Sequence, residues 1–356
     1  MSVLLLLLLS LLFSSSNLFL LSSAHSITLS LSRVAPPPSP AGNQWDNLKY
    51  HAASSLARAQ FIKNPKTQLY PSSYGEYTVT LGFGTPPQKL SFIMDTGSSL
   101  VWFPCTHNYT CINCNISKAD PTFIPKSSSS YKIVSCNSPQ CRWLFPSFKC
   151  KNHTLPCGYL YGYGSGNTTG LLLSESLTIP GLPVANFIAG CSVFSADLPP
   201  GGIVGFGRDP ESLPAQLGLK AFSYCLISHG FDDNTTASSD LVLMTTTPGG
   251  CKRPSANIQY TEFLSNTAFP DFYYVWLQNI SIGGVHVNVP DKYMVPNTKG
   301  NGGTMVDSGT TFTLMAIWSS KNSISKLGKN TLEPEILNKK TVWSRVIMFV
   351  LIIRIK

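Results

Sequence analysis

Short apolar stretches broken by glycine and proline dominate the chain from Tyr74 onward. The segment EYTVTLGFG alternates apolar and polar residues and stops at Gly-Thr-Pro-Pro, whereas KLSFIMD is a mostly apolar stretch that ends on an acid. GLLLSESLTI, FIAGC and GGIVGFG continue the pattern, and FYYVWLQNISIGGVHV is typical of a strand, a Gly-Gly turn and a second strand. The pattern predicts an all-β protein built from short strands.

The residues before Tyr74 follow other patterns. Residues 1–24 form an apolar run that ends in small residues, which is typical of a secretory signal peptide; a retained anchor is the alternative, because the run has no Lys or Arg ahead of it. Residues 25–44 are rich in Ser and Pro and predict a linker. Residues 45–63 carry apolar residues at three- and four-residue steps, which predicts an amphipathic helix. On its own pattern, this helix is either an ordinary surface helix or a basic segment that covers an acidic cleft.

The charge balance argues against a nucleic-acid partner. Only 12% of the residues are charged, and the net charge is +9. Six of these nine excess positive charges lie in residues 316–356, and the body of the chain has no basic patch interleaved with aromatic residues. We therefore expect no nucleic-acid binding.

The cysteines favour an oxidising compartment. Seven of the ten lie in residues 105–157, a stretch of little periodicity that we interpret as a stapled loop insert. Cys111 and Cys114 form one Cys-x-x-Cys pair, for which zinc is the alternative, but no second such pair accompanies it. We therefore expect disulfides and no metal, with a connectivity that sequence cannot give. Six Asn-X-Ser/Thr sequons agree with secretion and predict N-glycans, at Asn108, Asn115, Asn152, Asn167, Asn234 and Asn279.

Two segments 212 residues apart share one pattern. SFIMDTGSSLVW and GTMVDSGTTFTL each run from apolar residues through Asp, Ser/Thr, Gly and two further Ser/Thr, and then return to apolar residues. A single Asp-Thr-Gly is ordinary turn chemistry, but two copies in matching contexts indicate an internal repeat. Asp95 and Asp307 are therefore predicted to meet at a pseudo-twofold axis.

A pair of carboxylates at such an axis has defined chemistry. Two acids about 3 Å apart share one proton, because both cannot easily ionise together. The ionised acid can take a proton from a water molecule, and the protonated acid can hydrogen-bond the carbonyl that this water attacks. Gly97 and Gly309 let the backbone approach the acids. The hydroxyls beside them can hold the two loops together, namely those of Thr96, Ser98, Ser308 and Thr310.

At these residues the chain resembles the pepsin-like aspartic proteases, and especially the plant nepenthesin type. GFGTPPQKLSFIMDTGSSLVWFPC and GGTMVDSGTTFTL are similar to the two active-site segments of that family, and the cysteine-rich residues 105–157 resemble the insert of the nepenthesin type. GGIVGFGR resembles the strand that threads under the loop of the first acid. YGYGSGNTTG resembles the flap hairpin that closes over substrate.

The resemblance implies a fold, a site and a domain layout. It implies a bilobal pepsin-like fold, with Asp95 and Asp307 as catalytic residues and with Trp102 hydrogen-bonded to a flap tyrosine. Tyr163 fits that tyrosine best, and Tyr161 is the second choice. The basic segment then becomes a prosegment that neutralises the acid pair. The expected layout is a signal peptide at 1–24, a prosegment at 25–72, an N-terminal lobe at 73–248, a partial C-terminal lobe at 249–315 and a non-homologous basic tail at 316–356.

The resemblance ends after Leu314. The family's second lobe continues for roughly a hundred residues and includes a second apolar-apolar-glycine strand, for which the tail has no counterpart. The run VIMFVLII is too short to span a bilayer and is either a fragmentary strand or an exposed edge. Because an incomplete lobe cannot satisfy its sheet edges, we expect the chain as written to fold poorly or to be weakly active.

The sequence therefore predicts an aspartic endopeptidase of the secretory pathway, extracellular or vacuolar, with an activity that truncation is expected to impair. It is expected to act on proteins or peptides at acid pH as a monomer without a cofactor. The alternative is a non-catalytic, protease-like binding protein such as a xylanase inhibitor. Inhibitors of that type typically lose an active-site residue, whereas Asp95 and Asp307 both lie in intact motifs.

Overall fold

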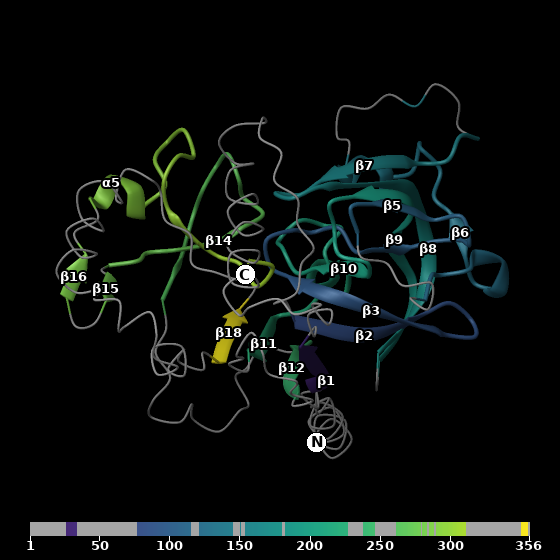
Figure 1. The fold of residues 1–356 in the computed structure, drawn as a ribbon, viewed down its shortest axis with the longest axis horizontal. Coiled ribbons are helices and arrows are strands. Elements are labelled where there is room, and N and C mark those ends of the chain that lie inside the picture. The colour runs from purple at the N-terminus through teal and green to yellow at the C-terminus, as the bar shows by residue number, and fades with distance from the viewer. Residues whose placement is uncertain are drawn as a thin grey trace, which may run out of the picture.

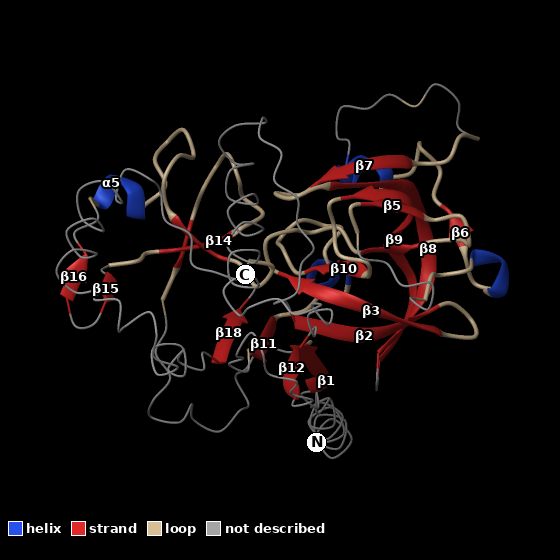
Figure 2. Ribbon diagram, viewed as in Figure 1, coloured by secondary structure: helices blue, strands red, loops and turns tan. Residues whose placement is uncertain are grey.

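The computed structural model shows a protein made mostly of strands with a few short helices (Figure 2). It describes residues 26–33, 77–114, 121–144, 150, 154–179, 182–226, 238–245, 261–278, 280–282, 285–287, 290–310 and 350–354. The all-β prediction is confirmed. The signal peptide and the amphipathic helix at 45–63 lie outside the described residues. Among those that are described, no helix has the length and apolar character needed to cross a bilayer.

Most strands before residue 245 join one large sheet. Their bounds are β1 Ser26–Arg33, β2 Tyr77–Phe83, β3 Gln88–Asp95, β4 Trp102–Pro104, β5 Thr110–Ile112, β6 Lys132–Ile133, β7 Gly158–Gly162, β8 Asn167–Ile179, β9 Leu182–Ala196, β10 Gly202–Gly205, β11 Ala221–Cys225 and β12 Ser238–Met244. With β18 Val350–Arg354 at one end, the sheet order is β18-β11-β12-β1-β2-β3-β10-β4-β9-β8-β6, with β5 beside β9 and β7 beside β8. Strand β2 also pairs with β8, so the run from β2 to β8 closes into a barrel (Figure 1).

The barrel encloses an aromatic core. Five phenylalanines come from separate parts of the chain and meet at ring-centroid distances between 4.8 and 6.2 Å. They are Phe83, Phe92, Phe103, Phe123 and Phe187, each at most 1% exposed. Each side chain buried in this way contributes roughly 1.5–3 kcal/mol relative to an exposed one. The core therefore fixes β3 and β4, the two strands on either side of the first acid's loop.

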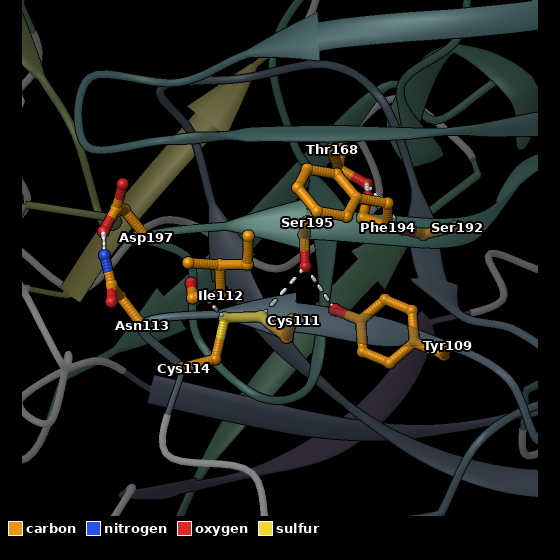
Figure 3. Close-up of a disulfide and its surroundings, with 10 residues drawn as sticks. All are labelled: Tyr109, Cys111, Ile112, Asn113, Cys114, Thr168, Ser192, Phe194, Ser195 and Asp197. Atoms are coloured by element: carbon orange, nitrogen blue, oxygen red, sulfur yellow. Dashed lines mark hydrogen bonds between the residues drawn. A yellow bond between two sulfur atoms is a disulfide. The ribbon is translucent and has the colours of Figure 1, made fainter.

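Four disulfides tie the cysteine-rich insert. The structure joins Cys105 to Cys191, Cys111 to Cys114, Cys136 to Cys150 and Cys141 to Cys157. The Cys-x-x-Cys pair thus forms a disulfide, as predicted. Figure 3 shows this pair against β9, where the Ser195 hydroxyl bonds the Tyr109 hydroxyl and lies 3.1 Å from the Cys111 sulfur. Nearby, the Asn113 amide donates to Asp197 at 2.9 Å.

The prediction of a linker at residues 25–44 is wrong in its first part. Residues Ser26–Arg33 form β1, which pairs antiparallel with β12 along its length and with the start of β2. The sequence SITLSLS carries the reason, because its apolar residues alternate with polar ones in the period of a strand. The serines of this segment and the proline run that follows it are typical of a linker, and they conceal the alternation.

The second half contributes smaller sheets. Strands β13 Phe263–Leu264, β14 Tyr273–Val275 and β17 Thr304–Val306 form one sheet, and β15 Ile280–Ile282 pairs with β16 Val285–Val287. Strands β15 and β16 lie on either side of the predicted Gly-Gly turn, whose two glycines lie outside the described residues. In Figure 1, β15, β16 and the short helix α5 (Asp291–Met294) lie at the end of the molecule opposite β6 and β8. The bilobal division itself stays a prediction.

Of the two alternatives for the apolar run in the tail, the structure shows the strand. Residues Val350–Arg354 form β18, which pairs antiparallel with β11 at the end of the large sheet. The described helical elements are all short, namely η1 Pro125–Ser127, α3 Cys141–Leu144, α4 Leu213–Gln216 and α5 Asp291–Met294.

Candidate active site

Asp95 is the last residue of β3, and its loop rests on β10. Strand β10 runs parallel to β3, with Gly205 opposite Asp95 in the register. The next residue, Phe206, donates its backbone N–H to the Asp95 carbonyl at 2.7 Å. This is the supporting strand that the segment GGIVGFGR predicted. It is present in full for the first acid.

The two carboxylates have the same hydrogen-bond partners. Asp95 Oδ1 accepts from the Gly97 N–H at 2.9 Å, and its Oδ2 accepts from the Ser98 hydroxyl at 2.5 Å. Asp307 Oδ1 accepts from the Gly309 N–H at 2.8 Å, and its Oδ2 accepts from the Thr310 hydroxyl at 2.5 Å. Residues two and three positions after each acid therefore fix both oxygens. The repeat seen in sequence is a repeat in geometry.

Thr96 and Ser308 bind the two loops to each other. The Thr96 N–H donates to the Ser308 hydroxyl oxygen at 3.0 Å, and the Ser308 N–H donates to the Thr96 hydroxyl oxygen at 2.9 Å. Each hydroxyl then donates to a carbonyl of the other half, at Val306 and Met94. Both side chains are buried. These reciprocal hydrogen bonds therefore fix the distance between the two acid loops and leave the loops little freedom to move.

The glycines after the acids lie against the opposite carboxylates. A Cβ at Gly97 would lie 2.6 Å from Asp307 Oδ1, and a Cβ at Gly309 would collide with Asp95 Oδ1. Only a residue without a side chain allows this approach. The structure thus brings Asp95 and Asp307 together at the centre of two crossed loops.

Burial and a like charge act on the first acid. Asp95 is 7% exposed. Its burial, and then the charge of Asp307, raise the pKa of Asp95 well above its ordinary value, although Ser98 and Gly97 partly offset this by bonding the carboxylate. The raised pKa is consistent with a pair of carboxyls that shares one proton.

Trp102 and Tyr163 are also brought together. The Trp102 indole N–H donates to the Tyr163 hydroxyl at 2.8 Å, and both side chains are buried. Tyr163 follows β7 at the bend before β8, in the segment compared with a flap. Tyr161 lies beside it with a centroid distance of 5.3 Å, and its hydroxyl accepts from the Ser99 N–H at 3.4 Å. Both tyrosines therefore face the first acid's loop, with different partners.

Sequence reasoning missed Tyr224. This side chain comes from β11 and is 3% exposed. Its burial, and then the charge of Asp307, raise its pKa, while a bond with Thr96 works in the opposite direction. Tyr224 thus lies beside both loops. The segment AFSYC shows only a buried strand, and no signal in it pointed to the site.

The second acid has a different support. Strand β17 precedes Asp307 and pairs antiparallel with β14, from Tyr273↔Val306 to Val275↔Thr304. Within the described part of the chain no strand runs parallel to β17 as β10 runs beside β3. Instead, the loop of Asp307 is held by Thr96 and by the first half.

Metal sites and N-glycosylation sites are two further kinds of site to compare with the structure. Within the described ranges, no group of three His, Cys, Asp or Glu side chains could hold a metal ion. Asn108 is exposed, and Asn167 is half-buried at the start of β8. The sequons at Asn115, Asn152, Asn234 and Asn279 lie outside the described residues.

Two family models match the chain. The model described as xylanase inhibitor N-terminal covers residues 77–243, and the model described as xylanase inhibitor C-terminal covers residues 272–329. Together they span most of the described chain and both acids. The C-terminal match runs into the segment beyond residue 315.

Known proteins with similar sequences or structures indicate the same family. Aspartic proteinase nepenthesin-2 of Nepenthes gracilis is 36% identical over 263 residues, which is 73% of this chain and 56% of that protein. Nepenthesin-1 of the same plant is 35% identical over 72% of this chain and 57% of its own length. The chain thus spans about half the length of the curated relatives it matches. The structure of basic 7S globulin from soybean shares the fold, with a TM-score of 0.53 at 15% identity over 88% of this chain and 71% of that one. The chain therefore belongs to the plant pepsin-like aspartic proteases of the nepenthesin and xylanase-inhibitor type.

Proposed function

We propose that this chain is an aspartic endopeptidase that hydrolyses peptide bonds at acid pH, with Asp95 and Asp307 as its catalytic residues. The observation that carries the proposal is the matched pair of acids, each bonded by the N–H and the hydroxyl two and three residues on. The names of the relatives at about one-third identity support it.

The reaction proposed for the pair uses water directly. One carboxylate takes a proton from a water molecule held between the acids, while the protonated carboxyl donates a hydrogen bond to the substrate carbonyl. The water oxygen adds to the carbonyl carbon and forms a gem-diol. Proton return to the amide nitrogen then breaks the carbon–nitrogen bond. The raised pKa of Asp95 supports one shared proton, so the pair offers one protonated carboxyl for the hydrogen bond and one carboxylate for the proton abstraction.

The remaining site residues would position this pair. Thr96 and Ser308 would hold the acids at a fixed spacing, and Gly97 and Gly309 would allow the close approach. Tyr163, held by Trp102, would close over the substrate as part of a flap. Protein or peptide chains are the substrates we propose, and the enzyme would act as a monomer without a cofactor.

The proposed setting is the secretory pathway, with export to the cell exterior or the vacuole. The apolar residues 1–24, the sequons and the four disulfides support that setting. In this proposal residues 25–72 act as a prosegment. The exposed position of Asn108 suits a glycan, and the half-buried position of Asn167 in β8 suits one less.

A peptide-digestion assay tests the proposal. Purified chain is incubated at pH 3–5 with a mixture of synthetic peptides, and the products are identified by mass spectrometry. We expect internal cleavage by the wild-type chain and by Asp240→Asn, an exposed control on β12, but none by Asp307→Asn. Equal cleavage by Asp307→Asn and wild type would refute the assignment.

The matched family models favour one second candidate. Both are described as xylanase inhibitor domains, so a non-catalytic protein that binds a xylanase is the alternative function. Residual xylanase activity measured with increasing amounts of the chain separates the two. Stoichiometric inhibition without peptide cleavage would favour the inhibitor, and cleavage without inhibition would favour the protease.

A further inference from the structure

A second group of acids lies where the chain leaves the first catalytic loop. Asp209, Glu211 and Asp271 come from two distant segments; Asp209 and Asp271 both raise the pKa of Glu211, and Asp209 also raises that of Asp271. Glu211 is 4% exposed, and its Oε2 has no hydrogen-bond partner among the described residues. Buried polar atoms normally have a partner, so this oxygen indicates a missing one.

The group is fixed to the catalytic loop. After β10, the Gly207 N–H donates to the Ser98 carbonyl at 2.7 Å, and the Asp209 N–H donates to the Ser99 hydroxyl at 3.3 Å. Ser99 in turn donates its N–H to the Tyr161 hydroxyl. The acids therefore stand beside the turn that follows Asp95, on the side of Tyr161.

The backbone that carries the group is held firmly. The Gln216 amide donates to the Glu211 carbonyl at 2.9 Å and to the Ile188 carbonyl at 2.9 Å. The Arg208 N–H donates to the Asp271 carbonyl at 3.1 Å, which fixes the two segments against each other. Such a group is preorganised for a ligand, because little has to move when one binds.

The charges of the group are only partly balanced. Burial, and then Asp209 and Asp271, raise the pKa of Glu211 to about 7. Burial is also the main cause of the raised pKa values of Asp209 and Asp271, and the Arg208 guanidinium works against it at Asp209. Arg208 is exposed and acts on Asp209. A second cation near Glu211 would offset both the cost of burying the carboxylates and the repulsion between them.

The three acids suit an organic cation better than a metal ion. The three acids do not form a set that could hold a metal ion, within the described residues. A Lys or Arg side chain fits better, since its apolar stem can lie on the half-buried Tyr161 ring while its charged head reaches the carboxylates.

We propose that Glu211, supported by Asp209 and Asp271, forms a subsite that binds a lysine or arginine side chain of a peptide lying under Tyr161. The proposal rests on the proposed function, because the peptide is the substrate of the neighbouring acid pair. Glu211 is a specificity-determining residue here and takes no part in the chemistry.

The proposal has a pH signature. The charged groups that act on Glu211 are Asp209 and Asp271, Arg208 acts on Asp209, and Tyr161 is the neighbouring phenol. Glu211, whose pKa is raised to about 7 chiefly by burial, loses its proton progressively as the pH rises from 4 toward 7. The preference for a basic side chain therefore grows over this range.

Binding of uncleavable peptides tests the subsite apart from catalysis. Hexapeptides with a central statine-type hydroxyl isostere carry lysine or norleucine at one position at a time, and their affinities for the full chain are measured by calorimetry at pH 4 and pH 6.5. At one position we expect lysine to be favoured about tenfold at pH 6.5 and less at pH 4. Glu211→Gln should remove this preference, whereas Glu262→Gln, an exposed control before β13, should keep it.

Each result decides the proposal. Equal affinity for lysine and norleucine at every position, no binding of either peptide, or the same effect from Glu211→Gln and Glu262→Gln would overturn it. The thermal midpoints of both variants show that they fold. Cleavable versions of the same peptides separate the two claims, since peptides that bind with the lysine preference but stay intact would contradict the protease alone.

Discussion

Each acid of the site depends on a glycine that belongs to the other acid's loop. Gly97 lies against Asp307, and Gly309 lies against Asp95. A methyl group at either position must displace a carboxylate, because the facing atoms are too close for a Cβ. The acids and glycines are thus one geometric unit, and the unit can be tested at a single residue.

Gly97→Ala should reduce peptide cleavage by about 100-fold or more, since displacement of a reacting group by about 1 Å can cost that much. The measurement is kcat/KM on one peptide at acid pH. Gly158→Ala is the control, because its new Cβ meets nothing closer than 3.8 Å. A Gly97→Ala enzyme with wild-type kcat/KM would show that the two loops are not closely packed.

The proton on Asp95 should be visible in stability. A carboxyl whose folded pKa is raised favours folding in its protonated form, so its contribution is lost as pH rises above about 4, the ordinary value for Asp. Asp95→Asn removes this titration. We expect the free energy of unfolding of the wild type to fall relative to that of Asp95→Asn between pH 3 and pH 7, by at least about 1 kcal/mol. Parallel pH profiles from urea titrations would contradict the raised pKa.

Residue-level prediction succeeded where the signal was local. The acids and the groups that bond them lie within three residues of each other, so one repeated motif contains both halves of the pair. Tyr224 reaches the same loops from β11, and Glu211 follows β10 by six residues. Their positions depend on how distant strands pack, and no short motif records that.

At the scale of elements, the β7–β8 hairpin carries the candidate flap. Tyr163 follows β7, and its hydroxyl accepts from the Trp102 indole at the start of β4. Loss of that hydroxyl leaves a buried N–H without its partner, which costs about 1–3 kcal/mol. The bond is therefore expected to set the position of the hairpin over the acids.

Tyr163→Phe should lower kcat/KM by about tenfold, equivalent to about 1.4 kcal/mol, and should lower the free energy of unfolding as well. Both are measured on the same preparation. Tyr131→Phe removes a hydroxyl from a tyrosine that is 37% exposed and should change neither value. If Tyr163→Phe behaves like Tyr131→Phe, the hairpin is not held by Trp102.

Strands can be predicted from the sequence where their apolar pattern and the turns that bound them are clear. The strands β2 and β3 and the pair β15 and β16 follow directly from apolar patterns and Gly-Gly or Pro-Pro turns. The serine content of β1 conceals its alternation of apolar and polar residues, and β18 has five residues without a turn signal, which do not select a partner strand. The partner strands β12 and β11 are remote in sequence.

At the scale of the molecule, a few buried contacts join the parts of the chain that supply the two acids. Besides Thr96 and Ser308, the Tyr273 hydroxyl donates to the Phe206 carbonyl at 2.7 Å. Tyr273 is 1% exposed, and it packs on Phe222 and Phe263. Strand β14 is thereby fixed to the segment that follows β10.

Tyr273→Phe should lower the free energy of unfolding by about 1–3 kcal/mol, because a buried carbonyl loses its donor while the ring packing stays. Urea titration followed by tryptophan fluorescence gives the value. Tyr131→Phe again serves as the control. An unchanged midpoint for Tyr273→Phe would mean that β14 is not held at Phe206.

The arrangement of the whole molecule can be predicted from the sequence only in part. The repeated acid motif predicted that residues 212 positions apart would meet, and they do. The barrel closure between β2 and β8, and the pairing of the disulfides, could not be read from the sequence, because both depend on which remote strands become neighbours.

The central claim is that Asp95 and Asp307 act as one proton-sharing unit, and a double-mutant cycle on peptide cleavage tests it most directly. The rates kcat/KM are measured at the pH optimum for wild type, Asp95→Asn, Asp307→Asn and the double variant, with Asp240→Asn as the control for loss of an exposed acid. We predict that either single change lowers kcat/KM by about 1,000-fold or more and that the double variant is within a few-fold of the single ones. Losses that multiply in the double variant, or a single variant that keeps a tenth of the wild-type rate, would contradict the account.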